Sequence, residues 1–543
     1  MRRLLSLIVT SLVVGMPVLA WGQASPPPPA TDQARALQLE ALQTVAMVLL
    51  DPTRSEADRL GAATALVKNA DRTAMPLLTG LLLGDRFASV RRAIAEGLGR
   101  YRAPEAAFSL RQAALSDPID SVRWAAGVSL LQTDPSQTDV LGTLLAHSDT
   151  LSAAALSLQE AAGFAALPAA FHATLESAFI HAFPDRGYNL VERAAMLKAL
   201  GQLQSQAAVG LMMDVLQNDN EDPFVRGAAA FSLGTLGVQR AVPALIAVLN
   251  NDSEALQVGA LGALGRLKNT QALFALTQVL NHEDSAEVRA AAAAALGALG
   301  ERSLPSLIDA LNVDPDPNVR QAAVSSLALM DDPDAGEAVR TFALGNYLTT
   351  CDPQACSGLA LATLSALAKL GQGDLAVSLL ENSLAALEDV LPFVFAFAEE
   401  QLIEVAVQVA QAAPQVLDVL LGSDNAFVQA IGLATLAQVK GEFARATLLP
   451  FTAPDAHRLL RRMAFEGLAP WARPEDFSSF NDELTNRDRR TRAAAFSALM
   501  RIGGAQTAAS FSAALASPDL ATSLQAVEAA FQFGNRILAS KQP

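Results

Sequence analysis

The residues of this chain that could bind a metal or move a proton are few and lie far apart. Its histidines are His147, His172, His181, His282 and His457. A hydrolytic zinc site usually needs two histidines one helical turn apart with a glutamate between them, and the chain has no His-Glu-x-x-His motif. His172 and Glu176 could share one face of a helix, but His181 would lie half a turn away. The sequence therefore predicts no metal centre.

One acidic segment imitates the start of a calcium-binding loop. Asp314, Asp316 and Asn318 match its first, third and fifth positions, but Val319 stands where the loop needs glycine and Ser325 where it needs glutamate. Turn and helix-cap chemistry explains these acids more simply. The chain also lacks a nucleophile elbow, a phosphate loop and a dinucleotide fingerprint. We therefore expect no enzymatic activity and no cofactor.

A repeated phrase predicts the elements that carry these residues. Val-Arg, an Ala-rich stretch and then Leu recur along the chain, as in Val90-Arg91 with Leu98 and Val288-Arg289 with Leu296. The arginines, or a glutamine in the same place, follow one another at single steps of 31 to 33 residues: Arg59, Arg91 and Arg123; Arg193, Arg226, Gln257, Arg289 and Arg320; Gln429, Arg461 and Arg492. A unit of this length is a helix pair that can bury its apolar face only against neighbouring units, so the period predicts a solenoid.

With an Asp before the Val-Arg phrase and a Pro-Leu-Ile helix after it, the unit resembles the HEAT repeat, in the short form named after phycobilisome-lyase HEAT-like proteins. The resemblance covers most of residues 36–540, with degenerate units at 134–190 and 335–425. It implies an all-α fold, a right-handed α-solenoid of about fifteen helix pairs. In HEAT arrays the helix beginning with Val-Arg lines the concave side, and the Asp and Arg near its start bond between adjacent repeats. The resemblance thus implies a structural ladder of Asp85, Arg91, Asp117, Arg123, Arg226, Asp284, Arg289, Asp316 and Arg320.

The positions one and five residues after each ladder arginine are expected to face the concave side. In the middle repeats these positions are mostly small or apolar, which would suit a helix or an extended peptide laid along a groove. The candidate groove residues are Trp124, Val128, Phe231 and Val258. The alternative is that tight curvature buries these positions between repeats.

The charge of the chain is strongly acidic and unevenly distributed. Its net charge of −16 argues against a nucleic-acid partner, because binding phosphates needs a basic face. Between Gly371 and Val439 there is no Lys, Arg or His. Ordinary solvation of helix faces explains part of this block, and its size favours a basic partner or association with divalent cations. The candidate acidic surface consists of Glu381, Glu388, Asp389, Glu399, Glu400 and Glu404.

The N-terminus has the pattern of a secretory signal peptide. Arg2 and Arg3 precede an apolar run, and small residues that suit cleavage follow it. We expect a signal peptide over residues 1–24, a Pro-rich linker over 25–35 and the solenoid over 36–540. The mature chain has no later segment suited to cross a membrane. The sequence therefore predicts an exported protein, periplasmic or secreted.

Two cysteines, Cys351 and Cys356, are the only thiols of the chain. In an oxidising compartment two such thiols are expected to pair, and a loop this short contributes on the order of 2 kcal/mol in the chain-entropy description. Free thiols and a redox-active pair are the alternatives, and the spacing is not the Cys-x-x-Cys of redox motifs.

These features favour a non-catalytic scaffold of the bacterial cell envelope that binds a protein or peptide in a solenoid groove. One alternative is an enzyme or a chaperone-like lyase, by analogy with bilin lyases built from the same short repeat. A further alternative is a structural protein that associates with cations through the acidic block. The oligomeric state cannot be inferred from the sequence.

Overall fold

The computed structural model describes residues 30–69, 74–102, 104–158, 171–185, 187–250, 253–330, 332–345, 353–386 and 391–539, with the backbone alone over 353–357, 381–386 and 391–398. Regular structure within these ranges is α-helix or short 3-10 helix, with no strand. The predicted signal peptide lies outside the described residues, as does the linker up to residue 29. The last six residues of the predicted linker are helical, because the first described helix already begins at Ala30.

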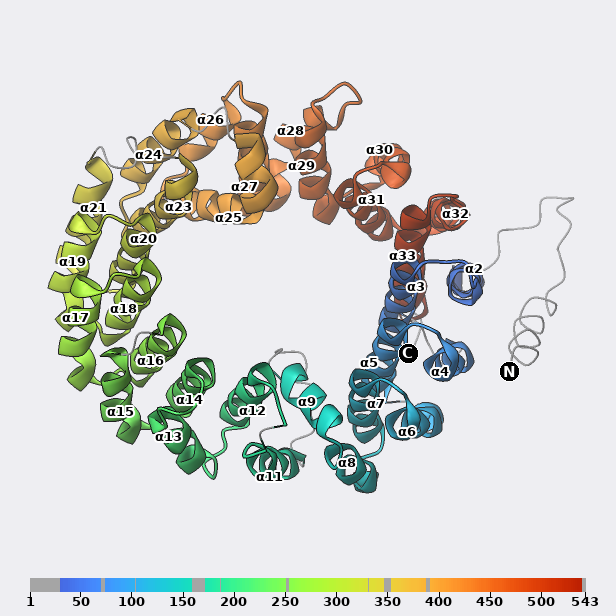
Figure 1. Cartoon of the computed structure of the whole chain (residues 1–543). Helices are drawn as coiled ribbons and strands as arrows, with labels where there is room; N and C mark the ends of the chain where they lie inside the picture. Colours follow the sequence, from blue (N-terminus) through green and yellow to red (C-terminus); the bar gives the residue numbers. More distant parts are fainter. Residues whose placement is uncertain are drawn as a thin grey trace, which may run out of the picture. The chain divides into compact units, whose positions relative to one another are not determined.

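The helices form an α-solenoid, as the repeat period predicts. From α2–α3 to α32–α33 they make fifteen successive pairs among the described residues, and the degenerate stretches are helical as well. The chain divides into two compact units, residues 1–154 with 165–170 and 469–543, and residues 155–164 with 171–468. Each unit is a double row of helices, in which the second helices of the pairs stack directly on one another and form the inner row (Figure 1).

In the first unit the inner row consists of α31 (Arg489–Ile502), α33 (Leu520–Ala539), α3 (Glu56–Asn69), α5 (Ala88–Tyr101) and α7 (Asp120–Thr133). The outer row consists of α30 (Phe477–Asp482), α32 (Gly504–Leu515), α2 (Ala30–Leu50), α4 (Met75–Gly84), α6 (Ala107–Ser116) and α8 (Thr138–Leu145). Helix α9 (Ser148–Ser157) follows α8.

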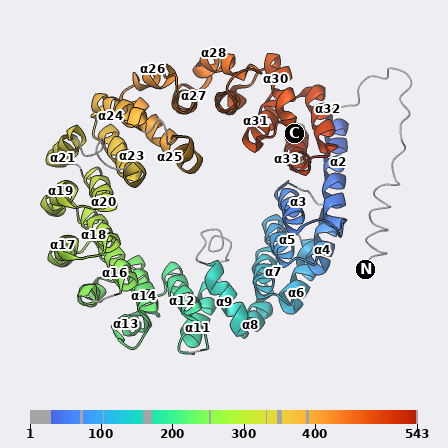
Figure 2. The same cartoon turned by 45° about the horizontal axis from the view of Figure 1, so that its top comes forward.

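In the second unit the inner row consists of α12 (Leu190–Gln202), α14 (Pro223–Thr235), α16 (Glu254–Leu267), α18 (Ala286–Leu299), α20 (Pro317–Leu327), α23 (Pro353–Lys369), α25 (Leu391–Ala412), α27 (Ala426–Lys440) and α29 (Arg458–Leu468) (Figure 2). The outer row consists of α11 (His172–Ala182), α13 (Val209–Gln217), α15 (Val242–Ala247), α17 (Leu273–His282), α19 (Leu304–Val313), α21 (Pro333–Leu344), α24 (Gly373–Ala386), α26 (Val416–Leu421) and α28 (Arg445–Leu448).

Local sequence explains how one repeat folds. The carboxylate of Asp222 accepts a hydrogen bond from the amide of Phe224 at 2.8 Å, so it caps α14 at its N-terminus. Val225, Ala229 and Leu233 are fully buried and form the apolar stripe of that helix. Gly237, with φ of +69°, then turns the chain towards the 3-10 turn at Gln239–Ala241 that leads into α15.

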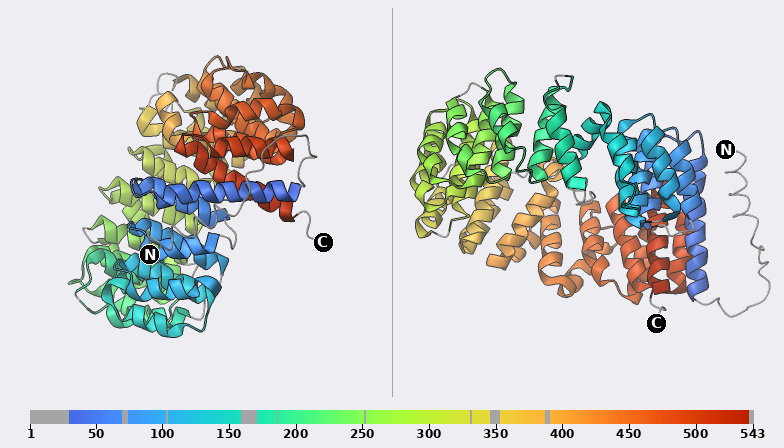
Figure 3. Two further views of the ribbon diagram at one scale, coloured as in Figure 1. Left: turned by 90° about the vertical axis from the view of Figure 1, so that its right-hand side faces the viewer. Right: turned by 90° about the horizontal axis from the view of Figure 1, so that it is seen from below.

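The first and last described helices, α2 and α33, lie side by side in the first unit (Figure 3). The buried amide of Gln38 donates to Oδ1 of Asn535 at 2.8 Å and to the carbonyl of Phe531 at 3.4 Å. Ser512 donates to the carboxylate of Glu40 at 2.6 Å. The first and last repeats are therefore neighbours in one array, and each covers the apolar face that a terminal repeat would otherwise expose.

Inner helices α14 and α16 approach closely because both carry glycine at the contact. A Cβ added at Gly259 would lie 2.6 Å from the carbonyl oxygen of Gly227 and 2.9 Å from its Cα. One turn further along α16, Gly262 has no heavy atom within 4 Å of such a Cβ and is exposed. The same helix thus contains one glycine that the packing requires and one that it does not.

These two glycines give a matched pair of substitutions. Gly259→Ala is expected to lower the free energy of unfolding by about 1–3 kcal/mol, because the backbones of α14 and α16 must move apart. Gly262→Ala is expected to raise it by up to about 1 kcal/mol through helix propensity alone. Urea denaturation followed by circular dichroism measures both changes. A stabilising Gly259→Ala would contradict the close approach.

Candidate binding face

A ladder of buried ion pairs joins successive repeats of the first unit. Nε and Nη2 of Arg91 on α5 donate to the two carboxylate oxygens of Asp117 in the next repeat, at 2.7 and 2.9 Å. Nη1 of the same arginine donates to the backbone carbonyl of Asp85 at 2.8 Å. The hydrogen bond with Asp117 raises the pKa of the Arg91 guanidinium. Arg59 makes the equivalent ion pair with Asp85, so each acid receives the arginine of the repeat before it.

The ladder of the second unit uses partly different acids from those that the resemblance implied. Arg289 pairs with Asp314, at 2.8 and 3.0 Å, and not with Asp316. Glu283, not Asp284, accepts from Gln257 at 3.0 Å. Each of these acids lies just before the predicted one, at the turn where the carboxylate can reach the preceding repeat. The predicted acids, Asp284 and Asp316, accept hydrogen bonds within their own repeat instead.

Those local roles are visible in the hydrogen bonds. The side chain of Asp316 accepts from the amide of Asn318 at 2.8 Å and so caps α20. The backbone carbonyl of Asp284 accepts from Arg289 at 2.9 Å. Arg193, one of the periodic arginines, forms a further ladder pair at 2.6 and 2.8 Å with Glu221, which was not predicted.

Two predicted ladder arginines bind their own repeat. Arg226 donates to the carbonyl of Leu216 at 3.0 Å and lies 2.9 Å from Asp219. Arg320 donates to the carbonyl of Asp314 at 2.5 Å. These bonds fix the turn between the two helices of one repeat.

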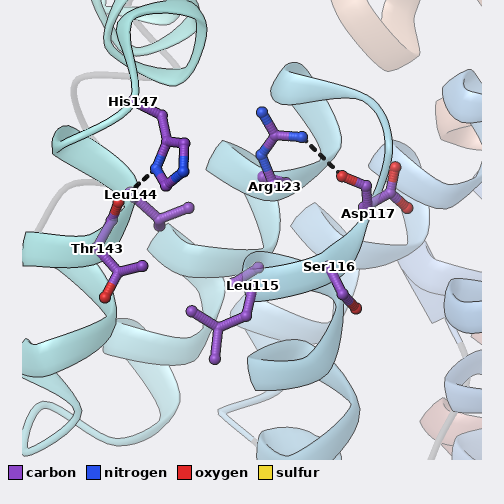
Figure 4. Close-up of a pocket in the computed structure, with 8 residues that line it drawn as sticks. Leu115, Ser116, Asp117, Arg123, Thr143, Leu144 and His147 are labelled. Atoms are coloured by element: carbon purple, nitrogen blue, oxygen red, sulfur yellow. Dashed lines mark hydrogen bonds between the residues drawn. The ribbon is translucent and has the colours of Figure 1, made fainter.

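At Arg123 the ladder reaches a neutral partner. Its Nε and Nη2 face the hydroxyl of Thr150 at 3.4 Å, where Arg91 meets a carboxylate, and its ion pair is with Asp120 of its own helix. Beside it lies a hollow of about 250 Å³ lined by Ala114, Leu115, Ser116, Asp117, Arg123, Thr143, Leu144 and His147 (Figure 4). Nδ1 of His147 donates to the carbonyl of Thr143 at 2.8 Å, so its own helix holds this ring.

The structure corrects two of the four candidate groove residues. Trp124 and Val128 on α7 are only 5% and 9% exposed, because the neighbouring repeats close over them. This is the alternative in which curvature buries such positions. Phe231 on α14 and Val258 on α16 are half-buried on the inner row of the second unit.

Small residues leave part of that inner row open. Gly262, Ala294 and Ser325 occupy the same position on α16, α18 and α20, five residues after the ladder residue, and all three are exposed. We call the solvent-facing side of α12, α14, α16, α18 and α20 the inner face. No side chain of the described residues stands over its middle at Gly262, so a bound chain could approach the helices closely.

Cations and aromatic rings lie together on the inner face. The guanidinium of Arg266 stacks over the ring of Phe231, with its carbon 3.9 Å from the ring centroid. Nζ of Lys198 lies 6.0 Å from the centroid of Phe224, a ring that is 43% exposed. Val191 on α12 occupies the position that Phe224 has on α14, and it is 56% exposed. This part of the face can offer both apolar contact and positive charge.

The structure describes three side chains of the candidate acidic surface, Glu399, Glu400 and Glu404. Glu388 and Asp389 lie outside the described residues, as does the side chain of Glu381. Glu399 on α25 forms an ion pair with Arg462 on α29 at 2.6 Å, and both side chains are 14% exposed. Glu400 and Glu404 are exposed. The block therefore receives a compensating cation from 63 residues further along the chain.

The predicted disulfide lies outside the described residues at Cys351, and the side chain of Cys356 is likewise not described. Within the described ranges, no cluster of three or more His, Cys, Asp or Glu side chains could hold a metal ion. No described helix is both long and apolar enough to span a membrane.

Comparison with protein families identifies the repeated unit. The family model for HEAT repeats matches residues 45–131, 186–256, 242–328 and 275–347. The chain therefore contains HEAT repeats over residues 45–131 and 186–347. No curated protein sequence matches it.

Several solved structures are similar to this HEAT-repeat chain. Yeast importin-β (Kap95p) shares 13% identity over 99% of this chain and 84% of its own, with a TM-score of 0.42. The complex of CpcE and CpcF of phycocyanin lyase from Nostoc sp. PCC7120 shares 22% identity over 52% of this chain and 94% of the matched chain, with a TM-score of 0.26. Human deoxyhypusine hydroxylase shares 19% identity over 54% of this chain and 96% of its own, with a TM-score of 0.22.

Proposed function

We propose that this HEAT-repeat protein is a non-catalytic scaffold of the bacterial cell envelope that binds a protein or peptide on the inner face of its second unit. The observation that carries the proposal is the exposed middle of that face, where small residues lie beside half-exposed aromatic rings. An extended segment or a helix could bury these rings on binding. The signal-peptide pattern of residues 1–24 supports export to the periplasm or beyond.

Site-specific photo-crosslinking in the native compartment tests the proposal. A photoreactive amino acid at Gly262 or Ala294 would report contacts of the inner face, and the same amino acid at Phe274 would report the outer row. Phe274 on α17 is 75% exposed, so it is an accessible control in the same unit. We expect discrete crosslinked species from the two inner positions and none from Phe274.

The same preparation tests export. The mass of the protein recovered from the envelope fraction should lack the first two dozen residues or so. Crosslinks from Phe274 with none from Gly262 and Ala294, or an intact Met1 in the cytosol, would contradict the proposed function.

A further inference from the structure

The two cations of the inner face, Lys198 and Arg266, have no carboxylate partner among the described residues. This sets them apart from the buried ladder arginines, such as Arg91, which hold acids of the next repeat. The net charge of the chain is −16, so acids outnumber the basic residues with which they could pair. The fold nevertheless leaves these two positive charges on the face proposed to bind a partner.

An aromatic ring lies beside each cation and does not neutralise its charge. A guanidinium stacked on a ring keeps its N–H edge available for a carboxylate, and Arg266 makes only a long contact of 3.5 Å with the hydroxyl of Thr235. The ring of Phe224 likewise faces Lys198 and remains 43% exposed. The stacked guanidinium of Arg266 is therefore preorganised, which lowers the cost of ordering it on binding.

Two acids of the inner face lie at the edge where its helices begin. Glu254 and Glu287 are exposed in the first turns of α16 and α18. Arg266 is close to the opposite end of α16, about 18 Å from Glu254 along the helix axis. Nζ of Lys198 lies near Phe224 in the first turn of α14, so Arg266 is the cation that is remote from these acids along the helix axis.

We infer that the part of the inner face between Lys198 and Arg266 binds an acidic segment of another polypeptide, with carboxylates on both sides of an apolar side chain. The carboxylates would meet Lys198 and Arg266, and the apolar side chain would cover Phe231 between them. Helices α12 and α16 are separated by α14, a span of about 18 Å at usual helix spacing. An extended segment covers that span in about five or six residues.

This inference deepens the proposed function and depends on it. It also replaces the basic partner that the acidic block favoured. Arg462 pairs with Glu399 within that block, whereas the cations of the inner face remain available.

Binding of three synthetic peptides to the full chain tests the inference. The peptides share one pattern of leucine and phenylalanine and differ only in their charged positions, which are glutamate, lysine or glutamine. We expect the glutamate peptide to bind at least about tenfold more tightly than the other two, and added salt to weaken it.

Charge reversal on the chain locates the site. Lys198→Glu and Arg266→Glu should each lower the affinity for the glutamate peptide by about tenfold or more. Arg240→Glu is the matched control, since Arg240 is exposed in the 3-10 turn before α15 and lies off the inner face. Unchanged melting temperatures would show that the variants fold.

The outcomes separate this inference from the proposed function. Tighter binding of the lysine peptide, or equal losses in all three variants, would overturn the acidic partner and leave the scaffold intact. Absence of binding by all three peptides, with crosslinks still formed at Gly262 and Ala294, would overturn it as well. If the crosslinks at Gly262 and Ala294 are absent as well, the proposed function is also wrong.

Discussion

Replacing Asp117 with alanine is expected to lower the free energy of unfolding by about 3–5 kcal/mol, because it leaves the guanidinium of Arg91 buried without its counter-ion. The two side chains are only 5% and 9% exposed, so water cannot replace the lost carboxylate. Asp117 also accepts a hydrogen bond from the amide of Ile119 at 3.0 Å, and that donor would lose its partner too. Urea denaturation followed by circular dichroism measures the loss.

The exposed ion pair between Arg111 and Asp139 provides the control. It also joins neighbouring repeats, through bonds of 2.5 and 3.2 Å, but its side chains are 38% and 64% exposed. Water and salt can replace such a contact, so Asp139→Ala should leave the denaturation midpoint nearly unchanged. Equal effects of the two substitutions would mean that burial does not determine how much an ion pair between repeats contributes to stability.

The repeat period was sufficient to predict the architecture but not the detailed partners within it. Steps of 31 to 33 residues between ladder residues are set by the helix pair, so the sequence alone predicted an α-solenoid. Which of two neighbouring acids reaches the preceding repeat depends on the exact turn. Asp314 and Asp316 are two residues apart with a proline between them, and only the structure shows that Asp314 pairs with Arg289.

Contacts between distant parts of the chain left no local signal in the sequence. Gln38 and Asn535 are 497 residues apart and belong to segments without the Val-Arg phrase. The pair Glu399 and Arg462 likewise joins the acidic block to a helix beyond it. A local pattern describes one repeat and its neighbours, so it could not show that the first repeat follows the last.

The sequence also could not decide which inner-row positions face solvent. Trp124 and Phe231 occupy comparable places, one and five residues after a ladder arginine. Their exposure depends on how closely successive helices approach, which is set by side chains from several repeats. The structure buries Trp124 and leaves Phe231 half-buried, and this difference can be measured.

Trp124→Ala should lower the free energy of unfolding by about 3–5 kcal/mol, because it removes a large side chain from a closed contact between repeats and leaves a cavity. Phe231→Ala should lower the free energy of unfolding by less, about 1–2 kcal/mol, since its ring is half-buried and partly covered by Arg266. Phe108→Ala is the reference for a solvent-facing aromatic residue, as its side chain is 77% exposed on α6.

Melting temperature and urea midpoint rank the three variants before any partner is known. We expect the largest loss for Trp124→Ala, an intermediate one for Phe231→Ala and almost none for Phe108→Ala. A loss for Trp124→Ala as small as that for Phe108→Ala would show that Trp124 faces solvent. The open inner face would then extend to α7, and Trp124 would return as a candidate contact for the partner. With the expected ranking, Phe231 is the aromatic residue whose truncation should weaken binding, by about 2 kcal/mol, while the scaffold stays folded.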